Sequence, residues 1–121
     1  MPRLNDIIEA IEHIRSATEG LSLDGFEADW QKRWLVERGI EIISEASRHI
    51  SGAVKDRHPT LPWPKVAGIG NILRHEYERI APDILWKLIH DDLPSLERVC
   101  REELAAGNAR TPPESGSAQP K

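Results

Sequence analysis

Hydrophobic residues recur at three- and four-residue spacing along most of this chain, and the pattern is interrupted where prolines gather. That spacing is typical of amphipathic helices, whereas a half-buried strand would alternate at every second residue. The strongest interruption is 58–64, His-Pro-Thr-Leu-Pro-Trp-Pro. Prolines this close together cannot continue a helix, because each removes a backbone donor and clashes with the preceding turn. The sequence therefore predicts separate helices, and no segment has the pattern of a strand.

Four helical segments follow from this pattern. They cover approximately 4–19, 27–50, 63–77 and 83–106. Gly20 is a fitting end for the first segment, since glycine readily takes the left-handed conformation that ends many helices. Pro94 should divide the last segment into 83–91 and 94–106, because proline breaks or kinks a helix interior. Amphipathic helices with short connectors favour an all-α fold, an antiparallel four- to five-helix bundle.

One folded domain is expected, because a chain of 121 residues is long enough for a single core. We expect the bundle to occupy residues 1–106. The remainder, 107–121, is rich in Pro, Gly, Ser and Thr without an apolar period, and is predicted to be disordered. Cys100 is the single cysteine, so no internal disulfide is expected and a reducing cytoplasm is the predicted location. Its apolar helical neighbours favour core packing over a reactive thiol.

The chain is acidic, with 16 Lys and Arg residues, 20 Asp and Glu residues and a net charge of −4. Binding nucleic acid through bulk electrostatics requires clustered Lys and Arg, so the composition disfavours that class while still allowing a small local basic site. No apolar run approaches the roughly 20 residues of a membrane span, and no membrane partner is expected. The sequence also lacks a Gly-rich phosphate loop, a dinucleotide fingerprint and the spacing of a zinc site.

Several conspicuous residues are interpreted as structural. Trp30 and Trp34 lie one helical turn apart, and core packing is the preferred interpretation over a partner surface. Gly39 in mid-helix costs about 1 kcal/mol relative to alanine, and a close approach between two helices would explain it. Glu45 is expected to pair with Arg48 or with the polar stripe described next, as an exposed ion pair of little energetic weight.

The segment 70–77, Gly-Asn-Ile-Leu-Arg-His-Glu-Tyr, concentrates chemically active groups in two helical turns. Residues three and four apart share a helix face, so Asn71, Arg74, His75 and Glu78 should form a polar stripe. The opposite, apolar side consists of Val66, Ile69 and Leu73. An imidazole with an amide one turn before it suits acid–base or phosphate chemistry. The alternative is a solvent-facing or carboxylate-capped histidine with a structural role only.

The order of several short motifs is similar to that of a known family. The motifs are, in chain order, Glu41-Ile42-Ile43-Ser44-Glu45-Ala46, Leu61-Pro62-Trp63, Gly68-Ile69-Gly70-Asn71, His75-Glu76-Tyr77, Ile84-Leu85-Trp86 and Asp92-Leu93-Pro94-Ser95-Leu96. Together they resemble the HepT-like branch of the HEPN superfamily, the toxin half of HepT–MntA toxin–antitoxin pairs. The resemblance extends over about residues 4–104, and the order and spacing of the motifs carry it.

The resemblance implies a small helical bundle that forms a homodimer. It also implies a metal-independent ribonuclease without a cofactor, with RNA as its substrate. The family signature is an arginine, four to six residues, a histidine and, two positions later, a tyrosine. By this signature His75 is the catalytic histidine, Asn71 the polar residue after the arginine, and Tyr77 the tyrosine. The implied partner is a minimal nucleotidyltransferase antitoxin of the MntA type, which attaches AMP to that tyrosine in a type VII-like system.

The signature arginine is absent, because the position immediately before Asn71 is Gly70. One hypothesis is a ribonuclease in which Arg74 replaces the missing guanidinium, Asn71 orients the imidazole or the substrate, and His75 acts as acid or base. A second hypothesis is a catalytically inactive binding subunit of a nucleotidyltransferase complex, with Tyr77 as acceptor or contact residue. A third is a helical dimer whose polar stripe is only structural.

Overall fold

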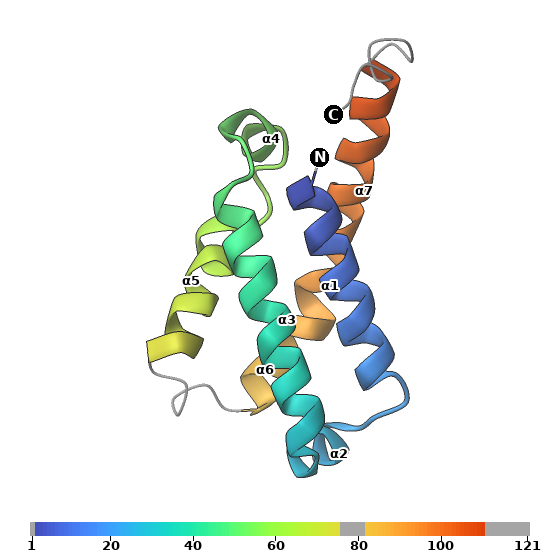
Figure 1. Ribbon diagram of the computed structural model, residues 1–121, viewed down its shortest axis with the longest axis vertical. Helices are drawn as coiled ribbons and strands as arrows, with labels where there is room; N and C mark the ends of the chain where they lie inside the picture. The colour runs from blue at the N-terminus through green and yellow to red at the C-terminus, as the bar shows by residue number, and fades with distance from the viewer. Residues whose placement is uncertain (1, 76–81, 111–121) are drawn as a thin grey trace.

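The computed structural model describes the backbone of residues 2–75 and 82–110, and the side chains of residues 3–73 and 82–107. These ranges hold seven helices and no strand, which confirms the all-α class (Figure 1). The helices are α1 (Pro2–Thr18), α2 (Leu23–Ala28), α3 (Trp30–Arg48), α4 (Gly52–Arg57), α5 (Trp63–His75), α6 (Pro82–Asp91) and α7 (Leu93–Arg110). Over the described residues, none of them combines the length and apolar character needed to cross a membrane.

Helix α3 lies at the centre of the bundle, with α1 on one side and α5 on the other (Figure 1). Both neighbours run antiparallel to α3, as expected for helices joined by short connections. Helix α7 packs against α1 and α6, and α6 also contacts the short helix α2. The α3–α5 pair therefore forms one flank of the molecule, and the α1–α7 pair forms the other.

The core is built largely from isoleucine, leucine and valine. Its least exposed side chains are Phe26, Leu4, Ile7, Ile11, Ile14, Ile40, Ile43, Leu85, Leu96, Val36, Val54 and Cys100. Each fully buried aliphatic side chain stabilises the fold by about 1.5–3 kcal/mol relative to an exposed one. Burial raises the pKa of the Cys100 thiol to about 12, so this cysteine packs as an apolar residue, as predicted.

Two glycines have the roles that the sequence suggested. Gly20, just after α1, has a φ of +80°, the conformation of a helix-ending glycine. A Cβ atom built at Gly39 would lie 2.8 Å from Cδ1 and 2.9 Å from Cγ1 of Ile14. Distances this short would force Ile14 to move, so a larger residue here loses packing energy. The predicted close approach of two helices at Gly39 is therefore confirmed, and the two helices are α1 and α3.

The segment 27–50, predicted as one helix, is interrupted at Asp29. This residue has a φ of −108° and a ψ of 92°, and its side chain accepts a 3.1 Å hydrogen bond from the backbone N–H of Lys32. A cap of this kind satisfies one of the free donors at a helix start. Helix α3 therefore begins at Trp30, and the residues before Asp29 form the separate short helix α2.

The predicted division of the last helical segment is confirmed, with a small shift in position. Helices α6 and α7 separate at Asp92, and Pro94 lies in the first turn of α7, where a missing N–H is tolerated. Helix α7 continues to Arg110, past the predicted end at 106. Residues 111–121 lie outside the described residues, so the disordered tail stays a prediction.

The tryptophans at the start of α3 face solvent, and their predicted place in the core is wrong. Trp30 is 54% exposed and Trp34 is 63% exposed, with ring centroids 5.2 Å apart in an edge-to-face arrangement. The inner side of α3 is already occupied by smaller residues, among them Val36, Ile40 and Ile43. Apolar residues thus extend around more of α3 than its buried side, which leaves large apolar side chains on the surface.

Candidate active site

Helix α5 contains the segment that was predicted to form a polar stripe. Pro64 lies in its first turn, where the absent N–H would have had no helical partner. Farther along, Val66, Ile69 and Leu73 are buried in the core. Asn71 is exposed. The predicted apolar side of this helix is therefore confirmed, whereas Asn71 is the one member of the polar stripe whose side chain the structure describes.

The other predicted site residues lie at or beyond the end of this helix. Helix α5 ends at His75, and positions 71 and 75 are one turn apart on the same side of the helix. The side chains of Arg74 and His75 lie outside the described residues, as does all of Tyr77. Their roles as phosphate ligand, acid–base residue and AMP acceptor stay predictions.

Gly70 lies on the buried side of α5. The family resemblance assigns an arginine to this position, where the present chain has no side chain. A guanidinium that holds phosphate with two parallel hydrogen bonds is not replaced by backbone alone. A cation that binds phosphate next to Gly70 must therefore come from another position in the chain.

Two side chains of α3 reach α5 at the carbonyl oxygen of Ala67. The Ser44 hydroxyl donates to this oxygen over 2.6 Å, and Nη2 of Arg48 donates to it over 3.0 Å. Ser44 is fully buried, whereas Arg48 is exposed. In a regular α-helix the same oxygen also accepts the N–H of Asn71. Both α3 side chains therefore end one helical turn before Asn71 and about two turns before His75.

The contact of Arg48 with Ala67 was not predicted, because Arg48 was expected to pair with Glu45. Oε2 of Glu45 lies 3.1 Å from Nε2 of His49, one turn along α3. That hydrogen bond is the main cause of the lowered pKa of Glu45, with a smaller contribution from the charge of Arg48. Glu45 is thus bonded to His49, Arg48 acts on it through its charge alone, and the charged side chains of the polar stripe lie outside the described residues. The sequence signal for the contact with Ala67 is the four-residue spacing of Ser44 and Arg48, which places both side chains on the same side of α3.

A second cluster fixes the segment that leads into α5. Glu103 of α7 is 5% exposed and accepts hydrogen bonds of 3.0 and 2.7 Å from Nε and Nη2 of Arg57. Nε2 of His58 lies 2.7 Å from the same carboxylate, and the His58 carbonyl oxygen accepts a 3.0 Å bond from the Trp63 indole. The Arg57 bonds, aided by His58 and opposed by burial, lower the pKa of Glu103 to about 2. The cluster ties the start of α5 to α7.

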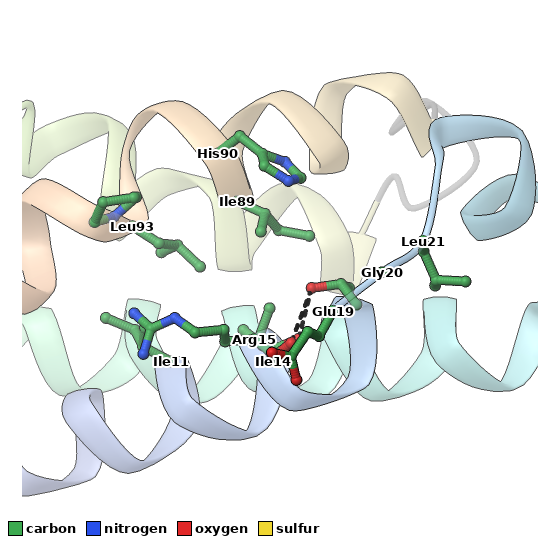
Figure 2. A pocket seen from close by; sticks show the side chains of 11 residues that line it. Ile11, Ile14, Arg15, Glu19, Gly20, Leu21, Ile89, His90 and Leu93 are labelled. Carbon is green, nitrogen blue, oxygen red and sulfur yellow. Dashed lines mark hydrogen bonds between the residues drawn. The ribbon is translucent and has the colours of Figure 1, made fainter.

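Three hollows in the described part of the molecule lie away from Asn71. One of about 250 Å³ opens between α1 and the α6–α7 junction, and Figure 2 shows Ile14 and Ile89 facing each other there, with Arg15 and His90 nearby. A polar pocket of about 340 Å³ lies between the 58–62 segment and α7. A third hollow, of about 480 Å³, lies between α1 and the start of α3. No group of three or more described His, Cys, Asp or Glu residues is arranged to hold a metal ion.

Comparison with known proteins places this helical architecture in a family. Residues 7–103 match the family described as "Ribonuclease HepT-like". A probable ribonuclease HepT of Thermococcus cleftensis is 38% identical over 78% of this chain and 86% of its own length. A putative RNase of Methanocaldococcus jannaschii is 34% identical, over 78% of this chain and 87% of its own length. A putative RNase of Caldanaerobacter subterraneus is 30% identical, over 85% and 92%.

The family match covers all of the helices from α2 to α6 and most of α1 and α7. The region includes Asn71, Gly70 and the contact of α3 with Ala67, so the candidate site lies wholly within it. No solved structure gave a significant match. The agreement of an all-helical fold, the family match and the relatives above 30% identity leads to one conclusion: the chain belongs to the HepT-like ribonuclease family of the HEPN superfamily.

Proposed function

We propose that the protein is the ribonuclease toxin of a toxin–antitoxin pair and cleaves RNA without a metal ion at the polar side of α5. The observation that carries the proposal is the exposure of Asn71 on a helix whose other side is buried, one turn before His75. Family membership supports RNA as the substrate, since the relatives are named as ribonucleases.

The proposed reaction needs an acid, a base and a phosphate ligand. His75 takes the proton of a ribose 2′-hydroxyl, and the resulting oxygen attacks the adjacent phosphorus. The leaving 5′-oxygen receives a proton from His75 of a second subunit, so that the dimer supplies both the base and the acid. Asn71 orients the imidazole or the substrate, and Arg74 contacts the phosphate. General acid–base catalysis of this kind contributes a factor of about 10² to 10⁴ in rate.

A homodimer is part of the proposal, because the mechanism uses two copies of His75. Support comes from the large apolar side chains exposed on the α3–α5 flank, including Trp34 at 63%, Ile42 at 36% and Ile72 at 39%. Exposed apolar side chains of this size are typical of protein contacts. Size-exclusion chromatography with light scattering should give the mass of two chains, and Trp34→Ser should shift the population towards one chain.

The proposed antitoxin is a minimal nucleotidyltransferase of the MntA type that transfers AMP to Tyr77. This step rests on the family resemblance and on the position of Tyr77 two residues after His75. Co-expression with such an enzyme should give a stable complex and a mass increase of one AMP on the peptide that contains Tyr77. Tyr77→Phe should remove the mass increase while leaving the complex. Failure of the two proteins to associate would contradict this part of the proposal.

The decisive experiment is cleavage of single-stranded RNA by the purified protein in the presence of EDTA. We expect wild-type protein to cleave, His75→Ala to lose at least about 10²-fold in rate, and Asn71→Ala to lose less. His13→Ala is the matched control, because His13 is exposed on α1, away from α5. Equal and negligible cleavage by wild type and His75→Ala would overturn the ribonuclease proposal.

The absent side chain at Gly70 favours one alternative, a catalytically inactive subunit of the nucleotidyltransferase complex. On that alternative the protein binds its partner but wild type and His75→Ala are equally inert. Gly70→Arg separates the two functions further. A large gain of cleavage in this variant from an inert wild type would identify a scaffold that lacks only its phosphate ligand.

A further inference from the structure

The guanidinium of Arg48 lies beside the polar side of α5. Arg48 is the last residue of α3, and its Nη2 donates a 3.0 Å hydrogen bond to the carbonyl oxygen of Ala67 on α5. In a regular helix that oxygen also accepts the N–H of Asn71 over about 2.9 Å. The Arg48 nitrogen and the Asn71 backbone nitrogen are therefore within about 6 Å of each other. The contact holds a cation at the surface that carries the candidate site.

Two other described cations near α5, Lys65 and Arg57, are already paired with carboxylates. Nζ of Lys65, in the first turn of α5, lies 2.9 Å from a carboxylate oxygen of Asp92. Arg57, at the end of α4, is bonded through two nitrogens to Glu103. An ion pair of this kind must be broken or shared before the cation binds another anion, which weakens that binding.

Arg48 forms no ion pair among the described residues. The acidic side chain closest to it along α3 is Glu45, and its carboxylate contacts His49 instead. A guanidinium has five N–H donors on three nitrogens, and the contact with Ala67 occupies one nitrogen, so the donors of the other two are available to a ligand. The anchoring contact also reduces the side-chain freedom that binding would remove. Arg48 is thus an exposed, partly preorganised cation.

We propose that Arg48 binds a phosphate group of the RNA substrate and supplies, from α3, the guanidinium that α5 lacks at Gly70. This inference rests on the proposed ribonuclease function. Phosphate is the expected ligand because two guanidinium nitrogens match two phosphate oxygens in spacing and charge. The chain has a net charge of −4, so its affinity for RNA depends on a few local cations rather than on the overall field.

If Arg48 had only a structural role, its removal should affect RNA binding differently, and a variant of Ser44 tests this. Ser44 donates to the same oxygen of Ala67 over 2.6 Å but carries no charge and is buried. If the contact only fastens α5 to α3, removal of Ser44 and removal of Arg48 should have similar effects on RNA. If Arg48 contacts phosphate, only its removal should change the dependence of RNA binding on salt.

The test measures RNA binding and RNA cleavage separately. The binding probe is a fluorescein-labelled single-stranded RNA with 2′-O-methyl groups, which lack the attacking hydroxyl. Fluorescence anisotropy gives its Kd in EDTA between about 50 and about 300 mM KCl. The variants are Arg48→Gln, Arg48→Lys and Ser44→Ala. The charge control is Arg98→Gln, because Arg98 is an exposed arginine of α7 with its nearest carboxylate, Glu102, at 3.8 Å.

We expect Arg48→Gln to weaken binding about 10-fold or more, as for removal of a charged hydrogen bond. The slope of log Kd against log salt should fall by about 0.7, the value for one phosphate of a single strand that is no longer neutralised. Arg48→Lys should retain most of the slope, because the charge remains. Ser44→Ala and Arg98→Gln should match wild type in slope. Circular dichroism and thermal unfolding check that each variant is folded.

The outcomes separate this inference from the proposed function. If wild type cleaves ordinary RNA and His75→Ala does not, but Arg48→Gln matches wild type in Kd and slope, the inference is wrong and the ribonuclease proposal stands. If no protein cleaves but Arg48→Gln weakens binding and lowers the slope, Arg48 is a phosphate ligand of a non-catalytic subunit. If wild type binds no RNA, both proposals fail.

Discussion

Arg48 and Arg57 both occupy the last position of a helix, yet their surroundings differ completely. Arg57 ends α4 and meets the carboxylate of Glu103 through two nitrogens, at 3.0 and 2.7 Å. Arg48 ends α3, donates to the carbonyl oxygen of Ala67 and forms no ion pair among the described residues. One arginine is therefore half of an ion pair, and the other is a cation held in place by an uncharged acceptor.

Helix α7 is the cause of this difference. It brings Glu103, 5% exposed, to the α4–α5 connection, whereas Arg48 meets no carboxylate from a distant element within the described residues. A buried carboxylate requires a partner, because its desolvation is not otherwise compensated. The charge of Arg57 is therefore neutralised by Glu103 where α5 begins. The charge of Arg48 remains available to a ligand.

The largest effect should follow from removing Arg57. Arg57→Ala takes away both hydrogen bonds that the guanidinium donates to the buried Glu103 carboxylate. Nε2 of His58 still contacts this carboxylate at 2.7 Å, so the buried charge loses its main partner rather than every partner, and the free energy of unfolding should fall by more than for an ordinary surface substitution. Urea unfolding followed by circular dichroism measures this value. A change no larger than that of an ordinary surface substitution, about 0.5 kcal/mol, would mean that the cluster has no structural weight.

Acid should weaken the same cluster. The Arg57 hydrogen bonds are the main cause of the low pKa of Glu103, about 2, against an ordinary value of about 4.3 when the chain is unfolded. Because the folded pKa is the lower one, this contribution is fully present above about pH 4.3 and is lost as the pH falls towards 2. Urea midpoints of wild type and Glu103→Gln, measured at several pH values, should converge over that window. Parallel curves would contradict the assignment.

A smaller loss should follow from replacing the carboxylate rather than the arginine. In Glu103→Leu the remaining charge belongs to Arg57, whose side chain is 46% exposed and therefore solvated. Breaking an ion pair is strongly destabilising when it leaves a buried charge unpaired, and the charge that remains in this variant is not buried. We expect a loss of stability below that of Arg57→Ala in the same urea experiment. The reverse order would show that desolvation of Glu103 does not control the energetics here.

The same contrast shows which features of the fold and the site could be predicted from the sequence and which could not. The helices, the break at 58–64, the apolar side of α5 and the core position of Cys100 follow from local periodicity and turn chemistry, which adjacent residues determine. The environments of Arg48 and Arg57 depend instead on residues 19 and 46 positions away, Ala67 and Glu103. No spacing rule within one helix relates such partners.

The tryptophans illustrate the same limit within a single helix. Trp30 and Trp34 share the spacing of core residues, but α3 has more apolar positions than its neighbours α1 and α5 cover. Which positions are covered depends on tertiary packing, so periodicity predicted a helix correctly and its buried side incompletely. For the candidate site, the sequence identified the exposed Asn71, while the cation contributed by α3 required the structure.

The smallest effect on stability should come from Arg48 itself. Arg48→Gln keeps a polar side chain with N–H donors at this position, and the charge that it removes is exposed to solvent. A substitution of this kind changes the free energy of unfolding by about 0.5 kcal/mol or less, so its urea midpoint should match that of wild type. A loss approaching that of Arg57→Ala would make Arg48 a structural residue and erase the contrast between the two arginines. An unchanged midpoint together with weakened RNA binding would show that Arg48 serves RNA binding while Arg57 serves stability. The physical reason is that only Arg57 faces a buried carboxylate.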